Sequence, residues 1–407
     1  MRKIELHWQI FAALIIAVLF GIYLTEYVFL ISWMGKVFLR ALNMIVIPLL
    51  LSSIISGVAN IGGGDNLGRL GLKTFSYYMS TSLLAILVGL LLVNLLKPGV
   101  GADLGFVKEV EGLKSSGESL GETLINIIPS NLFKAFIEGK MLSIIFFSLL
   151  FGFFITKADE KYRNNLTDFF NSTFEVMMKL TMFIIKFTPL GILGLVSGIV
   201  AEQAGDIEAL ISIFSRLGIY SIAVLLGLII HGSVTLPILL RLIGKVNPLK
   251  HFRAMRIPLL TAFSTSSSGA TLPLTMEAVE YNSGVSNKIT SFTLPLGATI
   301  NMDGTALYEC VAAIFIAQAY GIDLTVTQQI IIIFTSLLAS IGAASVPMAG
   351  LVMMTIILTA IGLPLEGIGL ILAVDRILDM SRTVINVWSD SCGAVIIARN
   401  EGEILNV

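Results

Sequence analysis

The chain alternates long apolar stretches with short polar ones. Eight apolar stretches are long enough, at 1.5 Å per helical residue, to cross a hydrocarbon core about 30 Å thick. They cover residues 9–30, 36–60, 72–96, 125–156, 168–201, 207–243, 287–319 and 365–399. Four of them contain a proline, which membrane helices tolerate where neighbours satisfy the freed backbone groups: Pro48, Pro129, Pro189 and Pro237. This pattern predicts an all-α integral membrane protein with eight transmembrane helices.

Two further apolar stretches, 254–281 and 326–362, are broken near the middle by small residues and a proline. The breaks read Ser264-Thr-Ser-Ser-Ser-Gly-Ala-Thr-Leu-Pro273 and Ser340-Ile-Gly-Ala-Ala-Ser-Val-Pro-Met-Ala-Gly350. Because each arm is too short to span, these stretches predict two re-entrant helical hairpins. Each is followed by one spanning helix, and a repeated hairpin plus helix is the pattern of inverted repeats with a binding site near the membrane centre.

The composition places most of the chain in or against lipid. Of its 407 residues, 56% are hydrophobic and 13% charged, and the mean hydropathy is +0.91, far outside the range of soluble globular domains. A net charge of −1 gives no reason to expect a nucleic-acid partner. The apolar run begins at Trp8, behind Arg2 and Lys3, without a small-residue cleavage site. It therefore predicts a first spanning helix rather than a cleavable signal.

Lysine and arginine are distributed unevenly between the loops. Residues 241–256 carry five of them and no acid, whereas the loop at 202–208 carries three acids and no base. Because basic loops stay in the cytoplasm, this distribution predicts that both termini are cytoplasmic. The first hairpin should then enter from the cytoplasm and the second from outside. We expect a plasma-membrane protein, in the cell inner membrane if the source is bacterial.

Charged residues gather near the C-terminus, inside an apolar segment. On a helix they share one narrow stripe, made of Asp375, Asp379, Arg382, Asn386 and Asp390. Charges at bilayer depth are costly, so they face a protein interior or a water-filled path and mark function. The alternative is an internal ion pair of Arg382 with Asp379 or Asp375. That pair alone would not require the stripe to continue to Asn386 and Asp390.

The pairing of Arg382 with Asp379 suits one class of ligand. A guanidinium binds a carboxylate in a bidentate manner, and this is worth most where water is excluded. A zwitterion with an extra carboxylate needs one cation and one anion at about this separation. The serine-rich tip Ser266–Ser268 offers hydroxyls and helix-end N–H groups for an α-carboxylate. The alternative for this tip is that small residues only allow close helix packing.

A second polar motif, Asn301-Met-Asp303-Gly-Thr305, interrupts another apolar segment. Unwinding there would free backbone carbonyls, and hard monovalent cations prefer oxygen ligands of this kind. Asp303 and Asp390 would add negative charge. The remaining candidate oxygens are the carbonyls of Gly297, Thr299, Asn301 and Met302 and the side chains of Tyr78, Thr81 and Ser82. For Tyr78, an ordinary packing role is the alternative.

Glu309 lies about one turn beyond Thr305, inside the membrane. A buried carboxyl can exist neutral near physiological pH, so Glu309 is a candidate proton carrier. A neutral acid hydrogen-bonded to a neighbouring helix is an equally good interpretation. His231 also lies in an apolar helix, where a structural histidine is the better hypothesis.

Several motifs, in this order along the chain, resemble the glutamate/aspartate transporter family of dicarboxylate/amino acid:cation symporters. The resemblance covers nearly the whole chain. The motifs are Tyr77–Ser82, Phe187-Thr-Pro-Leu-Gly191, Ser266-Ser-Ser-Gly-Ala-Thr-Leu-Pro273, Asn301-Met-Asp-Gly-Thr305, Val346-Pro347-x-Ala-Gly350 and Asp379-x-x-Arg382-Thr383-x-x-Asn386-x-x-x-Asp390.

The resemblance implies a homotrimer of elevator-type transporters. A scaffold domain would comprise residues 1–70 (first and second helices) and 98–205 (fourth and fifth). A transport domain would comprise residues 71–97 (third helix) and 206–407 (sixth to eighth helices and both hairpins). The transport domain would carry acidic amino acid and sodium across the membrane, within surrounding lipid and without an organic cofactor.

The resemblance also implies roles for individual residues. Arg382, Thr305 and Gly350 would hold the substrate side-chain carboxylate. The amino group would be held by Asp379, Thr383, Ser266 and Val346, and the α-carboxylate by Ser268 and Asn386. Three sodium sites would use Gly297, Asn301, Asn386 and Asp390; Thr299, Met302, Ser340, Ile341 and Ala343; and Tyr78, Thr81, Ser82, Asn301 and Asp303. Glu309 resembles the acidic residue that animal members use for proton and potassium coupling.

The chain departs from the family pattern at a few positions. Ser345 and Ser389 stand where glycine is usual, and Trp388 is bulky beside Ser389. The second arginine of many members is missing, since its two usual positions are Ser266 and Met380.

The leading function is a sodium-coupled acidic amino acid transporter, and three alternatives stay open. A C4-dicarboxylate carrier would have no need of Asp379, and neutral amino acid carriers lack an arginine at the position of Arg382. An ion channel also lines its path with polar residues. An enzyme is least favoured, because neither a nucleophile–base arrangement nor a metal cluster occurs in the sequence.

Overall fold

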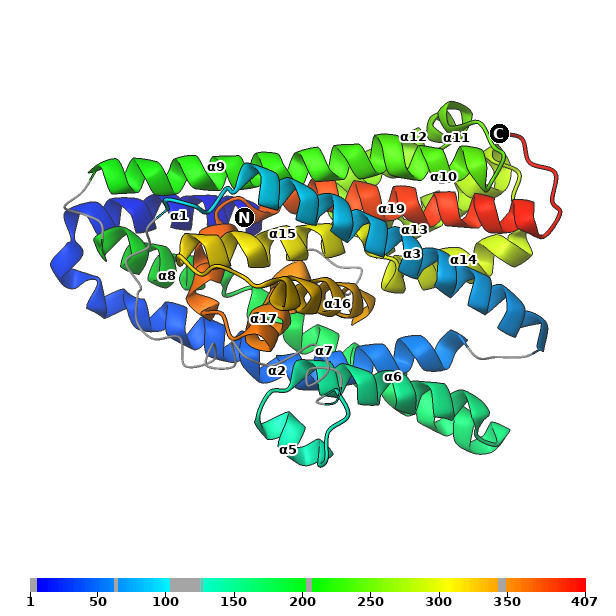
Figure 1. Ribbon diagram of the computed structural model, residues 1–407, viewed down its shortest axis with the longest axis horizontal. Coiled ribbons are helices and arrows are strands. Elements are labelled where there is room, and N and C mark those ends of the chain that lie inside the picture. Colours follow the sequence, from blue (N-terminus) through cyan, green and yellow to red (C-terminus); the bar gives the residue numbers. More distant parts are fainter. Residues whose placement is uncertain (1–5, 62–64, 103–124, 126, 203–206, 343–348) are drawn as a thin grey trace, which may run out of the picture.

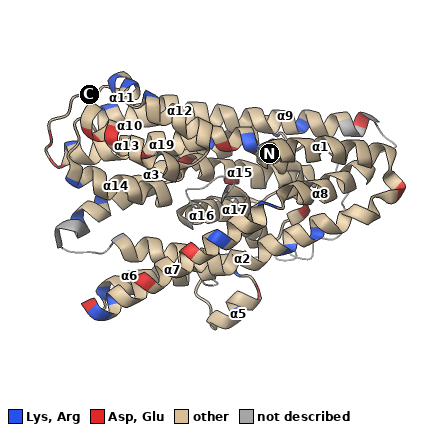
Figure 2. Cartoon of the chain, turned by 180° about the vertical axis from the view of Figure 1, so that it is seen from behind, with Lys and Arg blue, Asp and Glu red and all other residues tan. Residues whose placement is uncertain are grey.

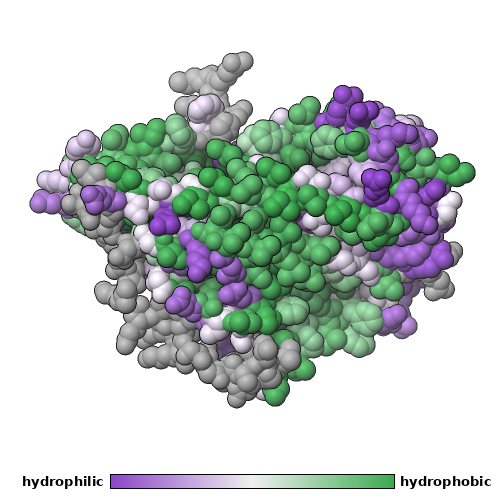
Figure 3. All heavy atoms as spheres, turned by 45° about the horizontal axis from the view of Figure 1, so that its top comes forward, coloured by the Kyte–Doolittle hydropathy of each residue, from purple (hydrophilic) through white to green (hydrophobic). Residues whose placement is uncertain are grey.

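The computed structural model describes residues 6–61, 65–102, 125, 127–202, 207–342 and 349–407. Within these residues every regular element is a helix. Most helices lie along the long axis of the molecule, and the short helix α5 (Leu132–Ile137) projects from one side (Figure 1). An apolar surface occupies the middle of one face, between polar surfaces toward the two ends (Figure 3). The described part of the chain thus confirms the predicted all-α class.

Five helices from the N-terminal half pack together. They are α1 (Leu6–Tyr23), α2 (Phe29–Ile61), α6 (Met141–Lys157), α7 (Glu160–Ile185) and α8 (Thr188–Glu202). α2 contacts α6, α7 and α8, and α1 lies along α8. Gly194 of α8 faces Gly35 of α2 so closely that a Cβ atom would meet backbone. Small residues at such crossings let membrane helices approach each other closely.

Most of the remaining helices form a second group. α3 (Asp65–Leu96) contacts α9 (Ile207–Ile230) and α15 (Asp303–Ala319), and α9 continues through the π-helical η3 (His231–Thr235) into α10 (Leu236–Leu242). After η5 (Leu365–Gly367) and α18 (Ile368–Leu372), α19 (Asp375–Asn400) crosses the group and contacts α14 (Asn287–Ile300) and α15. The division into scaffold and transport domains stays a prediction.

The structure has a helical hairpin where the first one was predicted, and its re-entrant position in a membrane stays a prediction. After α11 (Pro248–Ala254), its arms are α12 (Arg256–Thr265) and α13 (Ser268–Glu277), followed by the π-helical η4 (Ala278–Asn282). The chain reverses at Ser266, whose φ of 52° lies in the left-handed region. Ser267 then caps α13, because its Oγ accepts a hydrogen bond from the amide of Ala270 at 3.1 Å.

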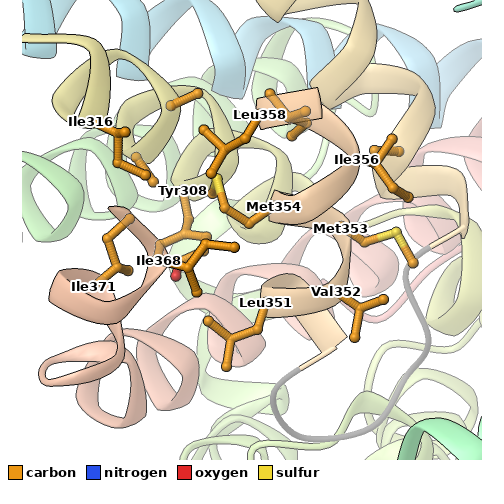
Figure 4. Close-up of a cluster of buried hydrophobic side chains, with 14 of the residues drawn as sticks. Tyr308, Ile316, Leu351, Val352, Met353, Met354, Ile356, Leu358, Ile368 and Ile371 are labelled. Atoms are coloured by element: carbon orange, nitrogen blue, oxygen red, sulfur yellow. The ribbon is translucent and has the colours of Figure 1, made fainter. Parts of the chain in front are cut away.

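The arms of the second predicted hairpin are α16 (Val326–Gly342) and α17 (Ala349–Ile361), which contact each other. Its tip, residues 343–348, lies outside the described residues. α17 is almost entirely buried, and Figure 4 shows its Leu351 and Met354 beside Tyr308 of α15 and Ile368 of α18. This apolar contact anchors the second arm inside the protein.

By length and composition, four described helical segments can cross a membrane: Phe29–Asn60, Arg69–Leu96, Ile211–Leu242 and Asn287–Ala319. α7 and α8 together would make a fifth span with a 52° bend. The expected first and fourth spans are shorter apolar helices, Trp8–Tyr23 and Met141–Lys157. The geometry thus supports a multi-pass membrane protein, while the expected count of eight spans stays a prediction.

Candidate functional site

The polar motif at residues 301–305 breaks a long helix in two. α14 ends at Ile300, Asn301 and Met302 have non-helical backbone angles, and α15 begins at Asp303. The unwound part is narrower than expected, because Asp303 to Thr305 are already helical. The carbonyls of Gly297 and Met302 accept amide hydrogen bonds from Asn301 and Ala306, both at 2.8 Å. Each carbonyl oxygen therefore keeps one lone pair, rather than two, for another partner.

Asn301 joins the broken helix to α19. Its Nδ2 donates to Asp390 Oδ1 at 2.9 Å and to Ser389 Oγ at 3.0 Å. A Cβ atom on Gly297 would lie 2.5 Å from Asp390 Oδ1 and 2.6 Å from the Tyr78 hydroxyl, so only glycine lets these oxygens reach the backbone. The structure thereby brings Gly297, Asn301 and Asp390 together, as expected for the first sodium site.

Asp303 is the second buried carboxylate of this region. Ser82 donates to its Oδ1 at 2.6 Å, and His231 Nε2 lies 3.0 Å from its Oδ2. Thr81 Oγ1 lies 3.4 Å from Asn301 Oδ1. Tyr78 donates instead to the carbonyl of Thr293 at 2.8 Å. Thr81, Ser82, Asn301 and Asp303, which were expected at the third sodium site, thus lie close together on α3, in the helix break and at the start of α15.

The expected second sodium site is described only in part. Ile341 of α16 packs in one apolar cluster with Ile300 and Tyr78, which places the end of the second hairpin's first arm against the broken helix. The Ser340 and Thr299 hydroxyls donate to carbonyls of their own helices, at 2.8 and 2.9 Å. Ala343 lies outside the described residues, as do Val346, Ser345 and Met348.

Asn386 links the residues expected at the substrate site to the helix break. Its Oδ1 accepts from the amide of Gly304 at 2.8 Å, and its Nδ2 lies 3.2 Å from both Thr305 Oγ1 and Met302 Sδ. A Cβ atom on Gly304 would lie 2.5 Å from the carbonyl oxygen of Arg382. Glycine at this position therefore allows the start of α15 to contact the backbone of α19.

Arg382 is only 1% exposed and lies at the centre of a buried charge cluster. Its Nη2 donates to Asp379 Oδ1 at 2.7 Å and lies 3.2 Å from Asp375 Oδ1. The internal ion pairs that were the alternative interpretation are therefore present. Nε and Nη1, however, have no hydrogen-bond acceptor among the described residues. A Cβ atom on Gly350 would lie 2.8 Å from Nη1, so the second arm of the second hairpin contacts the guanidinium.

The first hairpin tip presents buried hydroxyls. Ser266 and Ser268 are 2% and 4% exposed, and the Ser266 hydroxyl has no hydrogen-bond partner within the described part of the chain. On α19, Thr383 is also buried, and its hydroxyl donates to the carbonyl of Asp379 at 2.8 Å. The sequence-predicted substrate residues that the structure describes are thus buried, and two of them, Ser266 and Arg382, have polar atoms without a hydrogen-bond partner in this part of the chain.

The sequence patterns did not indicate two contacts, one of Arg382 and one of Asp303. The Tyr308 ring lies under the Arg382 guanidinium, with Cζ 3.8 Å from the ring centroid, a cation–π contact. Tyr308 could have been found, because it follows Thr305 by three residues and so shares its helix face. His231 was expected to be a structural histidine, and the structure shows that its partner is Asp303. A single histidine in an apolar helix does not indicate, from the sequence alone, which residue it contacts.

Glu309 is fully buried in α15. Neither of its carboxyl oxygens has a hydrogen-bond partner among the described residues. A hydrogen bond to a neighbouring helix, the alternative to proton transfer, is therefore not seen in this part of the chain. The role of Glu309 in coupling stays a prediction.

The charges of the two polar centres differ. Around Arg382 one cation pairs with two carboxylates, whereas Asp303 and Asp390 form no ion pair with lysine or arginine in the described part of the chain. Two buried carboxylates without a lysine or arginine partner, one of them beside His231, are costly unless cations compensate them. Paired hairpins, a broken helix and such a centre together define the class of a secondary membrane transporter.

Comparisons with known proteins agree with this class. The model of the sodium:dicarboxylate symporter family matches residues 6–400. The chain is 38% identical to a proton/sodium-glutamate symport protein of Geobacillus stearothermophilus, over 99% of this chain and 96% of that protein. It is 36% identical to the proton/glutamate-aspartate symporter of Escherichia coli strain K12, over 98% and 93%. It is also 36% identical to excitatory amino acid transporter 3 of Mus musculus, over 98% and 86%. The chain belongs to the sodium:dicarboxylate symporter family.

Proposed function

We propose that this protein takes up acidic amino acids, aspartate or glutamate, together with sodium ions. Relatives whose names specify glutamate or aspartate support the substrate class. The observation that carries the proposal is the buried Arg382, whose Nε and Nη1 have no acceptor among the described residues while its Nη2 is held by aspartate. A guanidinium in this state can receive one more carboxylate where water is excluded.

The groups around Arg382 suit the other parts of such a substrate. Asp379 would offer a carboxylate to the amino group, together with Thr383 on the same helix. The family resemblance suggests the carbonyls of Ser266 and Val346 as further acceptors, and Val346 lies outside the described residues. Thr305 and Gly350 would border the side-chain carboxylate. Ser268 and Asn386 would hold the α-carboxylate, and Asn386 also links this site to the cation site through Gly304.

Sodium is the proposed partner of Asp303 and Asp390. Oxygen atoms from carboxylates, an amide and hydroxyls converge beside the helix break, which is the ligand type that hard cations prefer. Because Asn301 contacts Asp390, Ser389 and Thr81, sodium there would preorganise the break against which Asn386 packs. Binding of sodium and of substrate would thereby strengthen each other.

The proposed mechanism is alternating access by an elevator movement within a homotrimer. Residues 71–97 and 206–407 would move across the membrane as a transport domain against a scaffold of residues 1–70 and 98–205. Both termini would lie in the cytoplasm, with the first hairpin gating the inner side and the second the outer. For Glu309 we propose proton or potassium coupling, because its buried carboxyl has no internal partner in the described residues.

A binding experiment tests the substrate class. Calorimetry on the purified protein in sodium should show binding of aspartate or glutamate, and no comparable binding in choline. Succinate lacks the amine that Asp379 requires, and alanine lacks the carboxylate that Arg382 requires, so both should bind far more weakly. Preferential binding of succinate or of alanine would favour the dicarboxylate or the neutral amino acid alternative within the family.

A further inference from the structure

A groove of about 890 Å³ lies between α10, α11, α12 and α19, away from the substrate site. Such a volume is in the range of pockets that hold small ligands, roughly 300–1,000 Å³. Its lining is mainly apolar, and its polar exceptions include two cations. The lining residues used below are Ile229, Pro237, Arg241, Lys245, Ile385 and Trp388.

The groove has a basic part and an apolar part. Arg241 lies twelve residues beyond Ile229 along the α9–α10 helix, which corresponds to about 18 Å at 1.5 Å per residue. One leaflet of a bilayer core about 30 Å thick is close to this length. An apolar channel as long as one leaflet, with cations at its end, matches the shape and polarity of a membrane lipid.

The cations of this groove have no counter-charge in the described protein. Neither Arg241 nor Lys245 forms an ion pair within the described part of the chain, and both are exposed. They belong to the stretch 241–256, which has five basic residues and no acid. Figure 2 shows lysine and arginine at this end of the molecule, around α10 and α11. A ligand of the groove would therefore need negative charge to pair with Arg241 and Lys245.

We propose that the groove binds an anionic glycerophospholipid from the cytoplasmic leaflet. Its phosphate would contact Arg241 and Lys245, and an acyl chain would lie along Pro237, Ile385 and Trp388 toward Ile229. A soluble anion would use only the basic end, and a zwitterionic lipid would leave the two cations uncompensated. The site would therefore select lipids whose headgroup carries a net negative charge.

Trp388 lines this groove and lies on α19, the helix that also carries Asn386 and Asp390 of the proposed substrate and sodium sites. Its Nε1 donates to the carbonyl of Gly232 in η3 at 3.0 Å, and its ring stacks on His251 with centroids 5.1 Å apart. On α19, Trp388 lies about 200° around the helix from both Asn386 and Asp390. A bound lipid would therefore press on the side of α19 that faces away from the substrate and sodium site.

Tryptophan fluorescence can test this binding directly, since the chain has only three tryptophans. In a Trp8→Phe/Trp33→Phe background, Trp388 is the single emitter. The protein would be reconstituted in phosphatidylcholine vesicles that contain a small fraction of phosphatidylglycerol, with bromine on the acyl chains of one lipid or the other. At equal mole fraction, brominated phosphatidylglycerol should quench Trp388 more strongly than brominated phosphatidylcholine.

Variants identify the headgroup site. Arg241→Gln/Lys245→Gln should lower the preference for the anionic lipid by roughly 10-fold or more, because each basic residue near an anionic lipid contributes several-fold in affinity. Arg253→Gln/Arg256→Gln removes the same charge from the same basic stretch outside the groove and should keep the preference. The charge-preserving exchange Arg241→Lys/Lys245→Arg should keep it as well.

Other outcomes would overturn the proposal. Equal quenching by both lipids would show ordinary bilayer contact, and no quenching by either would show that lipid does not enter the groove. Equal loss in both double glutamine variants would assign the effect to overall charge. Relief of quenching by millimolar inorganic phosphate would identify a site for soluble anions. None of these results depends on transport, so the proposed function is tested separately.

Discussion

Arg382→Ala should abolish recognition of acidic substrates. In the native protein the guanidinium is buried, contacts Asp379 and Asp375 through Nη2, lies over Tyr308 and leaves Nε and Nη1 for a further carboxylate. The substitution removes the one arginine or lysine that is buried among the described residues. A substrate with two carboxylates would then place its second charge in a dry site without a partner.

The size of the effect follows from these contacts. Removing one partner of a buried, hydrogen-bonded charge pair costs on the order of 3–5 kcal/mol. At about 1.4 kcal/mol per factor of ten, this corresponds to a loss of aspartate affinity of roughly 10²- to 10³-fold or more. Alanine or serine loses no such contact, so the variant should favour neutral amino acids in relative terms.

The assay is calorimetric titration of aspartate and of serine in sodium, with thermal unfolding measured in parallel to confirm that each variant is folded. Arg376→Ala is the matched control. It lies on the same helix and 3.9 Å from Asp379, but its side chain is 30% exposed. Its loss should change aspartate affinity by less than about tenfold, because the pair is long and partly exposed. Unchanged aspartate affinity in Arg382→Ala would refute the assignment of this residue.

Three further predictions concern the cation site, the coupling and the C-terminus. Asp390→Asn should shift the sodium dependence of aspartate binding to higher concentration and, by linkage, weaken aspartate at fixed sodium; a titration that does not move contradicts a sodium role. Glu309→Gln should keep substrate exchange but make net uptake independent of pH and internal potassium; indifference already in the wild type would make Glu309 structural. Glu401 accepts a 2.6 Å hydrogen bond from Lys73, which lowers the pKa of Glu401 below its ordinary value of 4.5. Glu401→Gln should therefore lower the melting temperature slightly at neutral pH, by an amount equivalent to about 1 kcal/mol or less, and the difference should vanish as the pH falls through that lowered pKa; an equal difference at all pH values would show that charge is not its cause.

The helices and the first hairpin could be predicted because their signals are local. Long apolar runs specify helices in lipid, and the clustered small residues from Ser264 onward mark a point where the first hairpin turns back. The stripe from Asp375 to Asp390 was predicted to be buried, and it is, because charges spaced by a helical turn share one face. The break at Asn301 could be predicted because asparagine, aspartate and glycine within four residues disfavour a continuous helix.

Contacts between distant segments could not be predicted in this way. Ser389 was treated as a departure from the family pattern, yet its hydroxyl accepts a hydrogen bond from Asn301. His231 reaches Asp303 from within a π-helical segment, whose extra residue per turn changes which side chains face the neighbouring helix. Such pairings depend on how whole helices pack against each other, and local patterns in the sequence do not specify that packing.

The most direct test of the central claim is transport by the purified protein in liposomes under an imposed sodium gradient. Uptake of labelled aspartate, glutamate, alanine and succinate would be compared with and without external sodium. The account predicts accumulation of aspartate or glutamate that requires the gradient and is lost in Arg382→Ala, with little accumulation of alanine or succinate. Accumulation of aspartate and glutamate that is independent of sodium, or stronger uptake of alanine or succinate, would contradict it.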